Sequence, residues 1–102
     1  MTVSPNDLRP ADLLALYYLY VYGQGSARTI AQTIDRKRGY VSRRLSTLTD
    51  HGLVERVYHE HGPVTLTDAG LQLITDCADT HILPQQRAKI EAAMPFSVQW
   101  DS

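Results

Sequence analysis

Between Ser26 and Gly70, two short helical patterns are joined by a tight basic turn and are followed by a hairpin pattern. The first helical pattern, over residues 27–34, repeats apolar residues at the three-and-four spacing of a buried stripe, and Ser26 is a suitable N-cap. The second helical pattern covers residues 39–51, and its core face is expected to consist of Val41, Leu45 and Leu48. A chain with this order folds as two packed helices followed by a hairpin.

The sequence on either side predicts three more helices. They are expected over residues 10–23, 68–79 and 84–94, opened by Pro10, by Thr67 as N-cap and by Pro84. The hairpin is expected to consist of a strand over 53–59, a turn over 60–63 and a return strand over 64–66. The predicted fold class is therefore mainly α with a short β-hairpin, an α+β fold built as one domain.

The formal charge of −1 conceals a separation of charge along the chain. Residues 28–58 contain seven lysines and arginines against three acids, a net charge of +4, whereas residues 59–102 carry a net charge of −4. Five of the cations lie within residues 36–44. A basic centre beside an acidic end is typical of a domain that presents one face to a polyanion.

The helix over residues 39–51 has a polar face suited to reading DNA. That face carries Arg43, Ser46 and Thr47, flanked by Tyr40 and Ser42. An arginine can bond two acceptors of guanine at once, and short polar side chains let the backbone approach the bases closely. Arg44 lies at the edge of the buried face, where it can contact a phosphate or pair with Asp50, Glu55 or a carbonyl.

The order of these elements resembles the winged helix-turn-helix transcriptional regulators of bacteria and archaea. It is similar to the MarR-like and ArsR-like groups, and to the short phage-repressor-like regulators of haloarchaea. The resemblance covers residues 10–78, and its motifs are Val41-Ser42-Arg43, Gly52-Leu53-Val54-Glu55-Arg56 and Leu66-Thr67-x-x-Gly70. It implies an N-terminal arm over residues 1–9, a winged helix-turn-helix domain over 10–78, and a C-terminal helix and tail over 79–102.

In such regulators the third helix enters the major groove and the hairpin, or wing, touches the flanking DNA. The resemblance implies contacts with base edges or nearby phosphates by Tyr40, Ser42, Arg43, Ser46 and Thr47. It implies phosphate contacts by Arg28, Arg36, Lys37 and Arg38, with Arg56 at the base of the wing. Arg44 completes the set of expected DNA-binding residues.

The helix over residues 10–23 has almost no polar face, although Asp12 lies in its first turn. Such a helix must be covered on more than one side, and in so small a protein a second copy of the chain is the natural cover. The expected homodimer interface joins this helix to the last one through Leu14, Tyr17, Tyr18, Val21, Ile90 and Met94. The tyrosines can alternatively line a ligand pocket.

Other classes of protein are not indicated. The lone Cys77 rules out an internal disulfide and fits a reducing cytoplasm, and we expect neither a cleavable signal nor a membrane span, since the longest apolar stretch covers 12 residues. His59 with His61, or Cys77 with His81, has the spacing of half a zinc site, but turn residues and a buried thiol explain both pairs. No catalytic constellation stands out, so an enzyme, a cofactor and a bound metal are not expected.

The sequence therefore predicts a homodimeric, sequence-specific regulator that binds double-stranded DNA and acts as a repressor. A winged-helix protein–protein interaction module in a larger assembly is the alternative from another class, because a fold alone does not determine function. A regulator that senses a small-molecule or metal effector between the first and last helices is a third possibility.

Overall fold

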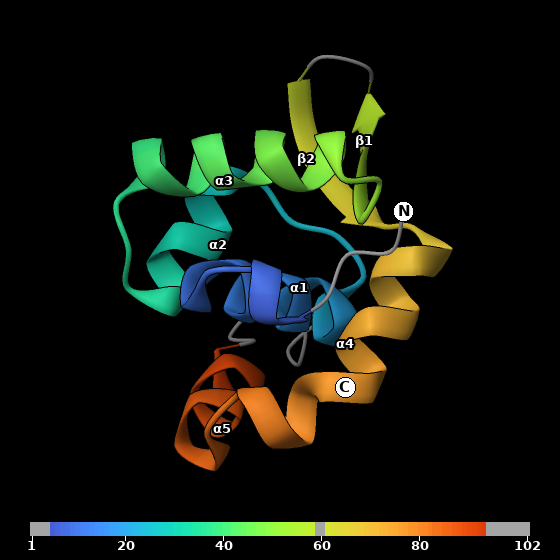
Figure 1. Ribbon diagram of the computed structural model, residues 1–102. Coiled ribbons are helices and arrows are strands. Elements are labelled where there is room, and N and C mark those ends of the chain that lie inside the picture. The colour runs from blue at the N-terminus through green and yellow to red at the C-terminus, as the bar shows by residue number, and fades with distance from the viewer. Residues whose placement is uncertain (1–4, 59–60, 94–102) are drawn as a thin grey trace, which may run out of the picture.

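The computed structural model describes residues 5–58 and 61–93, and within them it contains five α-helices, one short 3-10 helix and two strands (Figure 1). The helices are α1 (Pro10–Tyr22), α2 (Ala27–Ile34), α3 (Arg38–Asp50), α4 (Asp68–His81) and α5 (Pro84–Ala92), and the 3-10 helix is Pro5–Asp7. The strands β1 (Val54–Tyr58) and β2 (His61–Leu66) form one antiparallel hairpin. The predicted fold class, mainly α with a short β-hairpin, is confirmed.

Helix α1 lies at the centre of the fold, between α3 on one side and α5 on the other (Figure 1). It begins at Pro10, where the Asp12 side chain accepts a hydrogen bond from the backbone N–H of Arg9 at 2.9 Å. It ends before Gly23, whose φ of 87° favours glycine. Since α1 contacts α2, α3, α4, α5 and β2, the chain's own elements cover its apolar surface.

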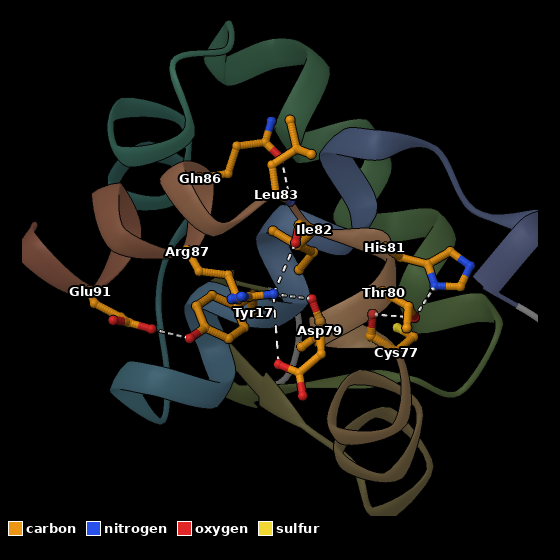
Figure 2. A network of polar contacts seen from close by, with 11 residues as sticks. Tyr17, Cys77, Asp79, Thr80, His81, Ile82, Leu83, Gln86, Arg87 and Glu91 are labelled. Carbon is orange, nitrogen blue, oxygen red and sulfur yellow. Dashed lines mark hydrogen bonds and ion pairs between the residues drawn. The ribbon is translucent and has the colours of Figure 1, made fainter.

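Helix α5 covers α1 on a side that sequence analysis assigned to a second copy of the chain. The Tyr17 hydroxyl donates a hydrogen bond to the Glu91 carboxylate (Figure 2), and the Tyr22 hydroxyl donates one to the carbonyl of Ile90. Burial, reinforced by the bond to Glu91, raises the pKa of Tyr17 to about 12. The prediction that Leu14, Tyr17 and Ile90 form a dimer interface is wrong, because all three are buried within one chain.

The other residues of that predicted interface leave little surface for a partner. Tyr18 and Val21 are half-buried against the same core, and the ring centroid of Tyr18 lies 4.6 Å from that of Tyr22. Met94 lies outside the described residues. Helix α1 therefore offers a second copy no continuous apolar face.

Helix α2 has the bounds that the sequence predicts, and α3 lies one residue before its predicted range of 39–51. The hydroxyl of Ser26 caps α2 by accepting a hydrogen bond from the N–H of Thr29 at 3.2 Å. Asp35 follows α2 with a φ of 61°, a left-handed conformation that Asp tolerates better than most residues, and it turns the chain into α3. The turn is tight, and α2 and α3 pack directly against each other.

The hairpin is longer on its return side than predicted. The residue pairs of its register include Val54 with Leu66 and Tyr58 with His61, with an irregularity between Arg56 and Tyr58. The prediction that 61–63 belong to the turn is therefore wrong, because this irregularity and the positive φ of Gly62, 84°, let the ladder continue. Gly25 adds a short bridge to the sheet: its N–H and carbonyl bond the backbone of Val64 at 3.1 and 2.8 Å.

Two predicted boundaries differ from the structure. Helix α4 continues to His81 and so crosses the boundary expected between residues 78 and 79, and α5 packs on the same core as the rest of the chain. Within the expected N-terminal arm, Leu8 joins the core at 9% exposure.

In the described part of the chain, no helix combines the length and the apolar character needed to cross a membrane.

At the corner between α4 and α5, Arg87 holds the two helices together. Its guanidinium donates hydrogen bonds to the carbonyl oxygens of Ala78 and Ile82 at 2.8 and 3.0 Å (Figure 2). The Asp79 carboxylate, 3.7 Å from the same guanidinium, is almost fully exposed, so this ion pair contributes little to stability.

Candidate nucleic-acid interface

The outer face of α3 carries short polar side chains around one arginine. Ser42, Arg43 and Ser46 are exposed, and Tyr40 and Thr47 are partly exposed. The opposite face carries Val41, Leu45 and Leu48, each at most 2% exposed, which confirms the predicted core stripe. Helix α3 lies at the outside of the molecule (Figure 1), so the exposed side chains of its polar face can contact a ligand.

Five exposed cations lie on α2, on α3 and in the turn between them: Arg28, Arg36, Lys37, Arg38 and Arg43. Within the described residues, none of the five forms an ion pair with an acid. Arg36 is held at the turn because its guanidinium donates hydrogen bonds to the carbonyl oxygens of Ile34 and Asp35, at 3.1 and 3.2 Å. The positive charges of this region are therefore available to a polyanion.

Arg44, in contrast, points into the protein. Its guanidinium donates two hydrogen bonds to the Asp12 carboxylate, at 2.8 and 2.7 Å, and its side chain is 19% exposed while that of Asp12 is 0% exposed. These bonds raise the pKa of Arg44. The expectation of a DNA contact by Arg44 is corrected, as are its suggested partners Asp50 and Glu55, because two-point pairing with a buried carboxylate occupies the guanidinium.

Sequence analysis missed Asp12 as the partner of Arg44, although a signal was present. Asp12 is the one acid in an otherwise apolar helix, and a buried carboxylate requires both a cation and hydrogen bonds. It receives them from Arg44 of α3 and from the N–H of Arg9. The pair thereby fixes the position of α3 on α1.

A pocket of about 450 Å³ lies where α2, α3 and the hairpin meet. Its lining includes Arg28, Arg38, Arg56, Ser26, Ser42 and Gly62. The structure thus brings together four residues that the sequence assigned to DNA binding, from three separate elements. No periodicity predicts this pocket, because it depends on how the hairpin folds back beside α2.

The described residues give little support for an effector site or a metal site. A cavity of about 140 Å³ lies between α1, the end of α2 and α5, beside Leu14, Arg36 and Lys89. It is smaller than the roughly 300–1,000 Å³ of typical ligand pockets. Among the described residues, no three His, Cys, Asp or Glu side chains form a group that could hold a metal ion. Cys77 is buried, which raises the pKa of its thiol and lowers its reactivity.

Comparison of the chain with protein-family models, curated proteins and solved structures gave no match. Three features of the structure therefore bear on function. They are the exposed polar face of α3, the exposed cations from Arg28 to Arg43, and the arginine-lined pocket beside the hairpin.

Proposed function

We propose that the protein is a winged helix-turn-helix DNA-binding protein, in which α2 and α3 form the helix-turn-helix and the β1–β2 hairpin is the wing. More particularly, it is a cytoplasmic, sequence-specific transcriptional regulator that represses by occupying its site. Helix α3 enters the major groove of double-stranded DNA. The mechanism is binding without chemistry.

One observation carries this proposal: the exposed face of α3 and its surroundings combine unpaired cations with short hydroxyl side chains. Arg43 is exposed between Ser42 and Ser46, with no acid paired to it among the described residues. A helix with this face can place an arginine on a base edge while the neighbouring cations contact phosphates.

The proposal includes two copies of the chain on a pseudo-palindromic site, which would place two α3 helices in major grooves about 34 Å apart. The interface does not use the buried Leu14, Tyr17 and Ile90. Among the described residues outside the wing, the exposed large apolar side chains are Tyr20, Leu71 and Leu83. Light scattering at high micromolar concentration tests this part, and a mass of 11.5 kDa would remove the dimer from the proposal.

The first experiment is a titration of the protein against fluorescent random-sequence duplex DNA at two salt concentrations. We expect micromolar binding that weakens steeply as salt rises, since each phosphate contact releases counterions. Absence of binding at low salt would contradict the DNA-binding proposal. Retained biological function after alanine substitution of the cations from Arg36 to Arg43 would instead favour a protein–protein interaction module.

The variant Arg43→Ala tests the role of α3 in reading sequence. It is expected to weaken binding to the selected site by about 1–3 kcal/mol and to relax base preference, because it removes a bidentate base contact. The matched control, Lys37→Gln, should weaken binding to all DNA equally and lower the salt slope by about one. Equal losses of Arg43→Ala on selected and random DNA, measured by anisotropy, would remove Arg43 from base reading.

A further inference from the structure

Three arginines from three different elements surround the pocket beside the hairpin. Arg28 lies in the first turn of α2, Arg38 begins α3, and Arg56 lies in β1. Among the described residues, none that lines the pocket is acidic, and no ion pair joins these arginines to an acid. Like charges brought together in this way repel one another, so an anion bound between them relieves an electrostatic cost.

The chemistry of the lining selects the kind of anion. Guanidinium groups are planar forks that match the oxygen atoms of phosphate and carboxylate groups, and several of them can share one phosphate. The hydroxyl of Ser42 also lines the pocket, and α2 begins at its rim, so the positive end of that helix adds to the potential. A phosphate group is therefore the ligand that this lining favours.

The surroundings of the pocket indicate the source of the phosphate. The pocket is continuous with the proposed DNA-binding face, since Arg38 and Ser42 belong both to its lining and to α3. A DNA strand that crosses from α3 toward the hairpin would place a backbone phosphate here.

We propose that this pocket binds one phosphate of the DNA backbone, held jointly by Arg28, Arg38 and Arg56. The proposal rests on the proposed DNA-binding function. It gives the wing a contact at its base through Arg56, and the sequence from Val57 to Leu66 contains no other arginine or lysine. The joint hold sets the register of α3 in the groove, because the three arginines come from elements fixed relative to one another.

A double-mutant cycle on DNA affinity tests the shared phosphate. Arg28→Gln and Arg56→Gln are each expected to weaken binding to one fixed duplex about tenfold, as the loss of a hydrogen bond to a charged group does. The double variant should lose at least about threefold less than the product of the two single losses, because both arginines hold the same phosphate. Thermal unfolding of each variant checks that the fold is retained.

The matched control pairs Arg28→Gln with Lys37→Gln, since Lys37 is exposed but does not line the pocket. Losses in this pair should multiply to within about twofold, as for independent contacts. If the Arg28 and Arg56 losses also multiply, the shared phosphate is overturned while DNA binding by the protein stands.

A second measurement separates this outcome from a failure of the proposed function. Arginine side-chain NMR signals of the DNA-free protein are recorded during titration with inorganic pyrophosphate. If the protein binds no DNA at low salt but pyrophosphate shifts the signals of Arg28, Arg38 and Arg56, the pocket serves a free phosphorylated ligand and the DNA-backbone assignment is overturned. If neither DNA nor pyrophosphate binds, both proposals are overturned.

Discussion

The variant Arg44→Met is expected to lower the free energy of unfolding by about 3–5 kcal/mol, although its neighbour Arg43 can be replaced almost without cost. The reason is the environment of Asp12, which is 0% exposed and receives two hydrogen bonds from Arg44. Without Arg44, the Asp12 carboxylate retains only the backbone N–H of Arg9 as a described donor. An uncompensated buried charge is among the most destabilising changes in a protein.

Urea denaturation followed by circular dichroism measures this effect, with Arg43→Met as the matched control. The control makes the same chemical change one residue away, on an exposed side chain, and should alter stability by less than about 0.5 kcal/mol. Adding Asp12→Asn to Arg44→Met should restore part of the loss, because it removes the unpaired charge but keeps an acceptor for Arg9. Similar stabilities of Arg44→Met and Arg43→Met would contradict the pairing.

The variant Gly70→Ala is expected to cost about 3 kcal/mol of stability, at the upper end of the usual overpacking range. A Cβ atom at Gly70 would lie 2.0 Å from the carbonyl oxygen of Leu53. A backbone carbonyl cannot rotate away as a side chain can, and this one accepts a hydrogen bond from the N–H of Thr67 at 3.1 Å. Relief of the clash must therefore displace the start of α4 or break the bond beside its cap.

Gly39→Ala is the matched control for Gly70→Ala. Gly39 also lies in the first turn of a helix, and its Cβ would meet only the Arg43 side chain, at 3.7 Å. This variant should be as stable as the wild type or slightly more stable, because alanine favours the helix. Midpoints of urea denaturation compare the two, and an unchanged midpoint for Gly70→Ala would show that α4 can shift freely.

Local signals predicted most of the fold. Pro10 and Pro84 begin α1 and α5. Ser26 and Thr67 cap α2 and α4, because their hydroxyl groups accept hydrogen bonds from the N–H groups of Thr29 and Gly70. Both signals act within a few residues of the chain. Within the motif Leu66-Thr67-x-x-Gly70, the role of Thr67 as the N-cap of α4 can be predicted from the neighbouring residues alone. Its glycine has a tertiary cause, the close approach of Leu53, that the motif alone does not reveal.

Features that depend on distant parts of the chain could not be predicted in the same way. The partners Asp12 and Arg44 are 32 residues apart, and no periodicity connects them. The burial of Tyr17 depends on α5, which begins more than 60 residues later. The same limit applies to the candidate site: the polar face of α3 follows from its helical period, whereas the meeting of Arg28, Arg38 and Arg56 requires the whole fold.

The inner side of α3 packs on the protein and its outer side does not, so residues on the outer side can be substituted without disturbing the packing. Val41, Arg44 and Leu45 bind the helix to the rest of the molecule, whereas Ser42, Arg43 and Ser46 touch little of it. Substitutions on the outer side therefore change the free energy of unfolding little. If α3 reads DNA, new binding preferences can arise by exchange of a few outer residues on an unaltered scaffold, and the same exchange is open to protein engineering.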